Sequence, residues 1–243
     1  MILIILPIKN ESKTVIETAN RLKEFIKKDQ EVLFIDDDSS DGTYQRIFLF
    51  NHPRIKVIKN RFDSGKGSAL KTGYIMSEFM YKMNGEDLIC FLDGDGQIDP
   101  VEINTFINLM KVYNADVVIG NKRHIFSSTR YTRLRRIISK GYNIIIRLLF
   151  DLKHEDTQCG IKIFKKSALE KVIDKVNVKR YAFDLELLIS FRENHFRIID
   201  APVKIQEQMN RGSIGISAIL NTFFDTIKIW IKKNRGDYKI WEC

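Results

Sequence analysis

The sequence predicts an α/β fold in which helices flank a mostly parallel central sheet. Short runs rich in β-branched and aromatic residues alternate with segments of helical period, which is typical of this architecture. The chain has 243 residues, 44% of them apolar, and only four prolines, which suits a well-packed globular core. We therefore expect residues 1–243 to form a single domain, with a change of pattern after residue 120.

The first half contains the clearest strands and the first helix. Ser12 is the expected N-cap of that helix, because the apolar residues that follow are spaced four, three and four, as in Val15, Ala19, Leu22 and Ile26. The expected strands cover residues 2–6, 32–35, 55–58, 88–92 and 117–120.

After residue 120 we expect a basic loop, a helix over 134–150, a loop at 156–160, a helix near 184–193 and a strand over 198–205. A last helix places apolar residues on one face, at Ile216, Ile219, Leu220, Phe223, Phe224, Ile227 and Ile231. Its far face carries Asn221, Asp225, Lys228 and Lys232. The apolar face either packs on the core or docks on a membrane or a membrane protein, and the pattern leaves both open.

The charge distribution favours an anionic partner. The formal net charge is +9, and residues 122–150 contain eight basic residues and no acid. Cys90, Cys159 and Cys243 have no CxxC spacing, which indicates reduced thiols and a cytosolic compartment. The apolar run at 2–6 is too short for a signal peptide, and no stretch approaches the roughly 20 apolar residues that span a bilayer. We expect any membrane contact to be peripheral.

Asp93, Gly94, Asp95, Gly96 and Gln97 directly follow the strand at 88–92. Ligands gather at the carboxyl ends of parallel strands, and two carboxylates with an amide oxygen suit Mg²⁺ or Mn²⁺. Such a metal would neutralise a diphosphate. The alternative is an ordinary polar turn.

Three adjacent carboxylates, Asp36, Asp37 and Asp38, end the second strand. They repel one another unless hydrogen-bond donors or cations compensate, and a ribose or a base edge supplies such donors. The alternative is a capped turn into the next helix, with Asp41 or Ser39 as the cap.

Two weaker motifs are the loop at 7–11 and the segment at 65–70. Glycines in the second would allow the backbone to approach a ligand, and a helix N-terminus favours anions. A P-loop is excluded, because Asn60 stands where that motif requires a glycine. An ordinary strand-to-helix connection is the alternative for each.

Together and in this order, the four motifs resemble those of the family 2 glycosyltransferases, which have the GT-A nucleotide-diphospho-sugar transferase fold. That family has Pro-x-x-Asn-Glu, Asp-Asp-x-Ser-x-Asp-Gly, Gly-Lys-Gly-x-Ala and Asp-x-Asp-x-Gln in this sequence order. The resemblance continues through Gly120 to Arg123, the loop at 156–160, and Ala201 to Val203. The chain looks most similar to dolichyl-phosphate glucosyltransferases and mannosyltransferases, and residues 156–164 favour the glucosyl branch.

This resemblance implies inverting, metal-dependent transfer of glucose from UDP-glucose onto a polyprenyl or dolichyl phosphate. It implies a peripheral enzyme on the cytoplasmic face of a membrane, with a separate membrane protein as a further partner. GDP-mannose is the alternative donor, and a sugar hydroxyl, which would need a carboxylate base, is the alternative acceptor. Nucleic-acid binding is disfavoured, because clustered carboxylates would repel phosphates.

The resemblance also assigns residues, with 1–120 as the nucleotide-sugar-binding half and 121–243 as the acceptor-binding half. The donor would contact Pro7, Lys9, Glu11, Ile35, Asp37, Lys66, Asp93 and Gly94, and the metal Asp93, Asp95 and Gln97. The acceptor phosphate would contact Arg123, Arg135 and Ser139, with Arg136 as the alternative to Arg135. Asp156 is at most an orienting residue near the acceptor.

The chain departs from the family near its C-terminus. A Gly-(x)-Ser-Lys element usually supplies a lysine there, and the corresponding residues here, 211–215, contain none. Arg211 replaces that charge, or the loop closes differently. Upstream, Arg133, Arg135, Arg136 and Lys140 alternate with apolar residues and could lie along anionic headgroups, unless they form an ordinary solvated face.

Overall fold

We describe the protein from a computed structural model. The described residues are 1–61, 64–127, 133–152, 154, 156–205 and 216–240, and the side chains of 133–140 and 216 lie outside that description. Three of the expected acceptor residues, Arg135, Arg136 and Ser139, are therefore placed only by their backbone, and the segment 211–215 lies outside the described residues.

One seven-stranded sheet runs through the described part of the chain, in the order β3-β2-β1-β4-β6-β5-β7. Its strands are β1 (Ile2–Ile8), β2 (Gln30–Asp36), β3 (Ile55–Lys59), β4 (Leu88–Leu92), β5 (Val117–Asn121), β6 (Ile161–Lys165) and β7 (Ile198–Pro202). β6 is antiparallel to both neighbours, and the other pairings are parallel. The carboxyl ends of six strands and the amino end of β6 therefore share one edge.

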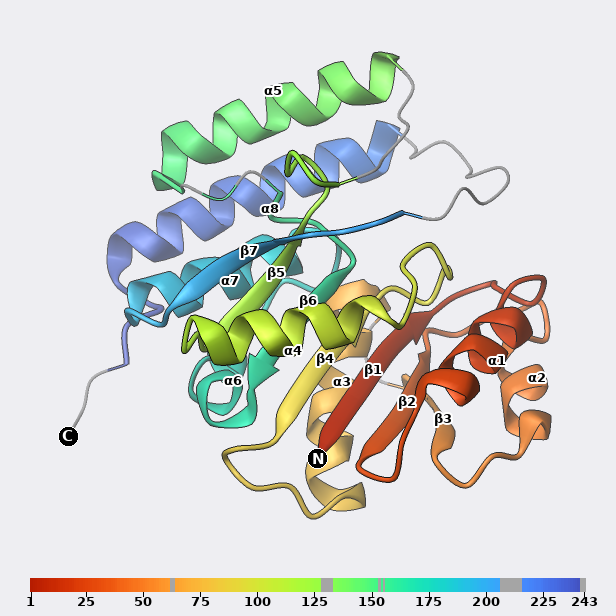
Figure 1. Ribbon diagram of the computed structural model, residues 1–243. Helices are drawn as coiled ribbons and strands as arrows, with labels where there is room; N and C mark the ends of the chain where they lie inside the picture. Colours follow the sequence, from red (N-terminus) through yellow and green to blue (C-terminus); the bar gives the residue numbers. More distant parts are fainter. Residues whose placement is uncertain (62–63, 128–132, 153, 155, 206–215, 241–243) are drawn as a thin grey trace.

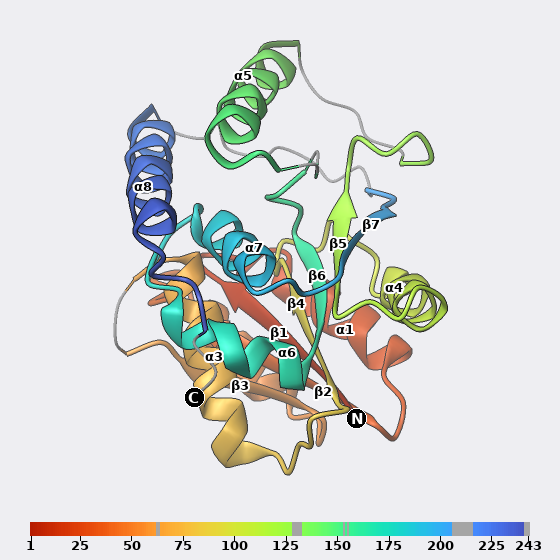
Figure 2. The same cartoon turned by 90° about the vertical axis from the view of Figure 1, so that its left-hand side faces the viewer.

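Eight α-helices pack around this sheet within the described residues (Figure 1). They are α1 (Val15–Phe25), α2 (Thr43–Phe50), α3 (Lys66–Met80), α4 (Glu102–Val112), α5 (Arg133–Phe150), α6 (Lys166–Val172), α7 (Phe183–Glu193) and α8 (Ile216–Arg235). One face of the sheet is covered by α1, α2 and α4, and the other by α3, α6 and α7. Figure 2 shows α8 outside α7, on the side away from the sheet.

The core explains why the first strand is apolar throughout rather than alternating. Leu3 and Ile5 pack toward the α3 and α7 side, whereas Ile4 and Leu6 pack toward α1 and α4, and all four are fully buried. A strand covered by helices on both faces has no solvent-exposed positions. The expected mostly parallel, helix-flanked sheet is confirmed.

The expected N-cap of the first helix is wrong. The helix begins at Val15 with Thr14 in the cap position, because the main chain forms a turn at Glu11, whose carbonyl accepts the N–H groups of Thr14 and Val15. Ser12 instead donates its backbone N–H to Asp41 across the neighbouring loop, at 3.0 Å. The last strand also ends at Pro202, before the expected 205.

Of the two alternatives left open for the apolar stripe of α8, packing of the stripe on the core is contradicted by its exposure. The stripe residues Ile219, Leu220, Phe223, Phe224 and Ile231 are 37–58% exposed. Thr226 and Ile229 face inward instead, where the Thr226 hydroxyl hydrogen-bonds that of Tyr142 on α5 at 2.9 Å. The helix thus leaves a large apolar surface unburied. Within the described residues, no helix combines the length and the hydrophobicity that crossing a membrane requires.

Candidate active site

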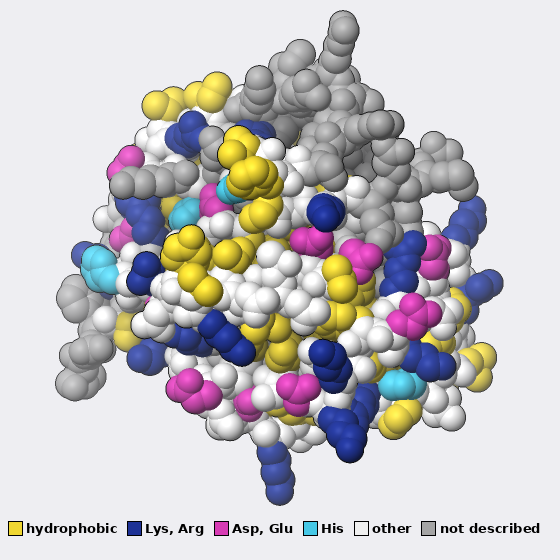
Figure 3. Space-filling view, in the orientation of Figure 1, with side chains coloured by type: hydrophobic (Ala, Val, Ile, Leu, Met, Phe, Trp, Pro, Cys, Tyr) yellow, Lys and Arg dark blue, Asp and Glu magenta, His cyan; other side chains and the backbone are white. Residues whose placement is uncertain are grey.

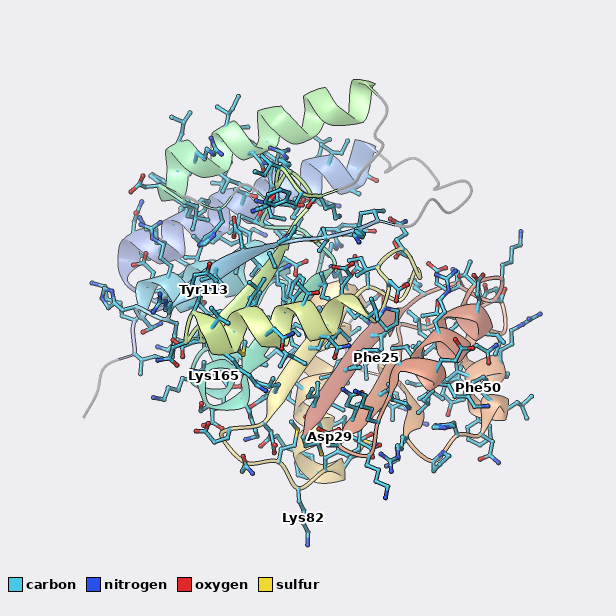
Figure 4. All side chains as sticks on the ribbon, in the orientation of Figure 1. Phe25, Asp29, Phe50, Lys82, Tyr113 and Lys165 are labelled. Atoms are coloured by element: carbon cyan, nitrogen blue, oxygen red, sulfur yellow. The ribbon has the colours of Figure 1, made fainter. Side chains whose placement is uncertain are left out.

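The predicted motifs meet at one edge of the sheet. The backbone N–H of Asp37 bonds to the carbonyl of Ile8 at 2.8 Å, which joins the ends of β2 and β1. The N–H of Asp93 bonds to the carbonyl of Gly160 at 2.7 Å, which joins the end of β4 to the start of β6. The residues labelled Asp29 and Lys82 in Figure 4 lie at the opposite edge, near the amino ends of the strands.

Asp37 lies in a cradle of donors at this edge. Its carboxylate accepts the backbone N–H of Gly65, at 2.9 Å to Oδ2, and Asn60 Nδ2, at 3.0 Å to Oδ1. Ser64 Oγ and Lys9 Nζ reach Oδ2 at 3.1 and 3.2 Å. For Asp37, the compensation that we expected from a ligand is therefore supplied by the protein itself.

This cradle keeps Asp37 ionised although its side chain is only 6% exposed. Burial by itself raises the pKa of the carboxyl group, but the hydrogen bonds from Gly65, Asn60 and Lys9 outweigh burial and hold the pKa below its ordinary value. Gly65 is suited to this position because its φ is +132°, and a Cβ there would collide with the carbonyl of Lys179.

The loop at 7–11 is tied to the turn after β2. Asn10 donates its N–H to Ser39 Oγ and accepts the N–H of Ser40, both at 2.9 Å, and the N–H of Glu11 bonds to Thr43 Oγ1 at 2.8 Å. The two motifs therefore form one structural unit. The side chain of Ile35 is fully buried against α3, so only its backbone can meet a ligand.

Lys66, the first residue of α3, stands between two carboxylates. Its ammonium nitrogen lies 2.8 Å from Asp93 Oδ1 and 2.9 Å from Asp184 Oδ2. Asp184 also pairs with Lys162 Nζ at 2.7 Å. Burial disfavours the charged form of each group, but attraction between the neighbouring carboxylates and ammonium groups outweighs it. The pKa values of Asp93 and Asp184 are therefore lowered, and that of Lys66 is raised.

The turn after β4 has the chemistry of a hard-cation site. Asp93, Asp95 and Gln97 present carboxylate and amide oxygens, which Mg²⁺ and Mn²⁺ prefer, and Asp95 Oδ1 also orders the turn by accepting the N–H of Gln97 at 3.1 Å. Across the described part of the chain, no three His, Cys, Asp or Glu side chains form a metal cluster by themselves. A cation here would therefore need the oxygens of Gln97 or of a bound ligand, and would share Asp93 with Lys66.

Two of the residues expected to face the acceptor, Arg123 and Asp156, lie at the same edge of the sheet. Asp156 accepts the backbone N–H of Lys122 at 3.1 Å and that of Gln158 at 3.3 Å. The N–H of Arg123 bonds to Asn121 Oδ1 at 2.8 Å. Asp156 thus orders the loop that carries the two basic residues.

Comparison with known proteins identifies the family. The sequence profile of glycosyl transferase family 2 matches residues 3–173. The chain belongs to glycosyl transferase family 2. This glycosyltransferase is 30% identical to a dolichyl-phosphate beta-glucosyltransferase of Trichomonas vaginalis, over 98% of this chain and 75% of that one. It is 26% identical to the dolichyl-phosphate beta-glucosyltransferase of Dictyostelium discoideum, over 90% of this chain and 68% of that one.

Solved structures agree on the fold of this glycosyltransferase. The glucosyl-3-phosphoglycerate synthase of Mycobacterium tuberculosis, in complex with Mn²⁺ and UDP-glucose, superposes with a TM-score of 0.69 over 95% of this chain and 78% of that one, at 16% identity. The mannosyl-3-phosphoglycerate synthase of Rubrobacter xylanophilus has a TM-score of 0.69, at 15% identity, over 100% and 76% of the two chains. The expected GT-A fold is confirmed.

The sequence analysis missed several residues of the candidate site. Asn60 and Ser64 complete the Asp37 cradle, and Lys162 and Asp184 complete the pairing around Lys66. One signal was available: Lys162 interrupts an apolar strand and Asp184 an apolar helix. A charge in such a run is costly unless it is paired.

Proposed function

We propose that this glycosyltransferase moves glucose from UDP-glucose onto a polyprenyl phosphate of the dolichyl type, with inversion at the anomeric carbon and with Mg²⁺ or Mn²⁺ as cofactor. The relatives named for this reaction support the acceptor and the sugar. The observation that carries the proposal is the meeting of the Asp37 cradle, the Lys66 ion pairs and the Asp93 to Gln97 turn at one sheet edge.

The donor half of the site would act by binding and orientation. The nucleoside would lie along the loop at 7–11 and the end of β2, against Pro7, Lys9, Glu11, Asp37 and the backbone of Ile35. Gly94 lets the ends of β4 and β1 pack closely, because a Cβ there would overlap the side chain of Ile8 and the carbonyl of Pro7, and the donor phosphates would lie at this junction. A divalent cation held by Asp93, Asp95 and Gln97 would neutralise the leaving diphosphate.

The acceptor half needs no strong base. A phosphate monoester is already ionised near neutral pH, so catalysis would rest on positioning and on cationic side chains around the attacking oxygen. Arg123, whose side chain the structure describes, would supply one of these cationic groups, and Asp156 would orient its loop. Arg135 and Ser139 on α5 are assigned by resemblance.

The surface of α5 and α8 fits peripheral binding to the cytoplasmic face of a membrane. Phe223, Phe224 and Trp230 on α8 are exposed, as are Ile144 and Leu148 on α5. Hydrophobic side chains also appear over α5 in Figure 3. The last turn of α8 contains Lys233 and Arg235. Apolar side chains beside basic ones bind anionic lipid surfaces, where a lipid phosphate acceptor lies.

The test is a transfer assay with radiolabelled UDP-glucose or GDP-mannose and a polyprenyl phosphate, with Mg²⁺, with Mn²⁺ and with chelator. We expect lipid-phase label from UDP-glucose only when metal is present. Asp95→Asn should reduce the rate by about 100-fold, whereas Asp29→Asn, an exposed carboxylate at the opposite edge, should leave it unchanged.

Each other outcome contradicts one part of the proposal. Transfer from GDP-mannose would show that UDP-glucose is not the donor. Label in a water-soluble saccharide would show that the acceptor is a sugar hydroxyl. Full activity of Asp95→Asn, or activity in chelator, would refute the role of the metal.

A further inference from the structure

Behind the metal-binding turn lies a chain of ion pairs that reaches into the core. It joins Asp93, after β4, to Lys66 on α3, Lys66 to Asp184 on α7, and Asp184 to Lys162 on β6. Asp184 and Lys162 are 3% and 1% exposed, so only the outer pair, Lys66 and Asp93, meets solvent. The four side chains therefore form one continuous cluster of charges.

The buried pair of Asp184 and Lys162 restricts the position of the Lys66 side chain. A lysine side chain is long and flexible, and a single carboxylate partner leaves much of its freedom. Here the Lys66 ammonium group is held from two sides. Asp184 is held in turn by Lys162, whose ammonium also donates to the carbonyl of Cys159 at 2.8 Å. The position of the charge next to Asp93 is therefore set from the interior.

Asp93 itself has little room to turn. A Cβ at Gly160 would overlap its Oδ2 atom, so the carboxylate lies directly against that backbone while Oδ1 meets Lys66. A cation bound to Asp93 would repel the ammonium group of Lys66, because both would lie against the same carboxylate. Asp184 supplies a second negative charge that retains Lys66 when Asp93 engages the cation.

We propose that Asp184 and Lys162 are positioning residues of the donor site, which hold Lys66 in place and thereby preset the Asp93 carboxylate for a divalent cation and a nucleoside diphosphate. This inference rests on the proposed function. Partners of metal ligands commonly contribute about 10- to 100-fold to metal affinity, and we expect an effect of that size although neither residue contacts the cation.

The protein contains a matched control for burial. Glu186 lies two residues further along α7 and is fully buried. It accepts the backbone N–H groups of Asn177 and Val178 at 2.8 and 2.6 Å, Lys232 at 3.1 Å and the Tyr238 hydroxyl at 2.7 Å. These contacts tie the C-terminal segment to α7. None of these contacts involves Lys66, Asp93, Asp184 or Lys162, so removing the charge of Glu186 leaves the partners of that chain of ion pairs in place.

The experiment compares Asp184→Asn, Glu186→Gln and the double variant Lys162→Met/Asp184→Asn with the wild type. Affinity for UDP in saturating Mn²⁺ is measured by calorimetry, Mn²⁺ affinity in saturating UDP by paramagnetic resonance, and the melting temperature by circular dichroism. Asp184→Asn should weaken both affinities about 10- to 100-fold. Glu186→Gln should lower the melting temperature and leave both affinities unchanged.

The double variant separates positioning from charge balance. It removes one positive and one negative charge, so the remaining pair, Lys66 and Asp93, is again neutral. We expect a higher melting temperature than for Asp184→Asn, with affinities that remain weak. If Asp184→Asn does not fold, the double variant carries the same test.

Two results would overturn the inference and are distinguishable. Wild-type affinity in a folded Asp184→Asn or double variant, or an equal loss in Glu186→Gln, would show that the chain is only structural. Absence of UDP binding by the wild type in Mn²⁺ would reject the donor assignment itself, and the inference with it.

Discussion

Replacing Asp37 by Asn tests the organisation of the proposed donor site most directly. The carboxylate accepts hydrogen bonds from Gly65, Asn60 and Ser64, and Oδ2 also meets Lys9. The N–H of Gly65 also lies 3.1 Å from Oδ1. An amide has one acceptor oxygen, so in either orientation its N–H₂ group faces at least two donors. Hydrogen bonds to a charged group contribute about 1.5–3 kcal/mol each. The Lys9 contact adds little, because that side chain is 48% exposed and screened by solvent.

We therefore expect Asp37→Asn to lower the free energy of unfolding by about 2–4 kcal/mol at pH 7. The difference should depend on pH with a definite sign. The pKa of Asp37 is lower in the folded protein than in the unfolded chain, so the charge stabilises the fold above about pH 4. That stabilisation is lost as the pH falls through the lower, folded pKa, and wild type and variant should then converge.

The assay is urea unfolding followed by circular dichroism, from pH 7 downward, with Asp38→Asn as the control. Asp38 is the adjacent carboxylate but is exposed, so its replacement should change the free energy of unfolding little. Equal effects of the two variants, or a difference that stays constant as the pH falls, would refute the reasoning.

Three further predictions concern packing, membrane binding and the C-terminal segment. Gly67→Ala should cost about 1–3 kcal/mol in urea unfolding, because its Cβ would overlap the start of α7, whereas Gly141→Ala, which has open space on α5, should gain about 0.5–1 kcal/mol. Phe224→Glu should reduce flotation with anionic vesicles about tenfold or more, because it replaces an exposed apolar side chain by a charged one. Phe79, an exposed phenylalanine on α3, is the control, and Phe79→Glu should leave flotation unchanged. Equal losses in the two variants would argue against docking through α8. Glu186→Gln should lower the free energy of unfolding by about 1–3 kcal/mol, and an unchanged denaturation curve would contradict the role assigned to its four donors.

Local patterns predicted many of the elements of this fold, although β6 and α6 were not among the expected ones. The strand expected at 88–92 is β4 with the same bounds, and the helices expected at 134–150 and near 184–193 are α5 and α7, each beginning one residue earlier. Runs of β-branched residues and a period of 3.6 residues reflect the local conformation of the chain, so they predict strands and helices without knowledge of the tertiary structure. The first N-cap failed because a loop 29 residues away binds the N–H of Ser12.

Ion pairs between distant side chains could not be predicted from the sequence. Lys66 belongs to a recognisable motif, yet its partner Asp184 is 118 residues away, and nothing in either segment encodes the other. The α8 stripe has the spacing of a core-facing helix, but α5 and α7 pack on Thr226 and Ile229 instead. Periodicity shows which residues share a face and does not show what covers that face.

By itself, the sequence determined the class of fold, the order of the motifs and the edge of the sheet at which they meet, because strand direction and turn chemistry are properties of short segments. Only the tertiary structure decided that donors within the protein compensate the charge of Asp37, that Lys66 is held from the core, and that α8 leaves its aromatic side chains exposed. Charge pairing and burial depend on distances between segments remote in the chain, and those distances exist only once the sheet and its helices have assembled.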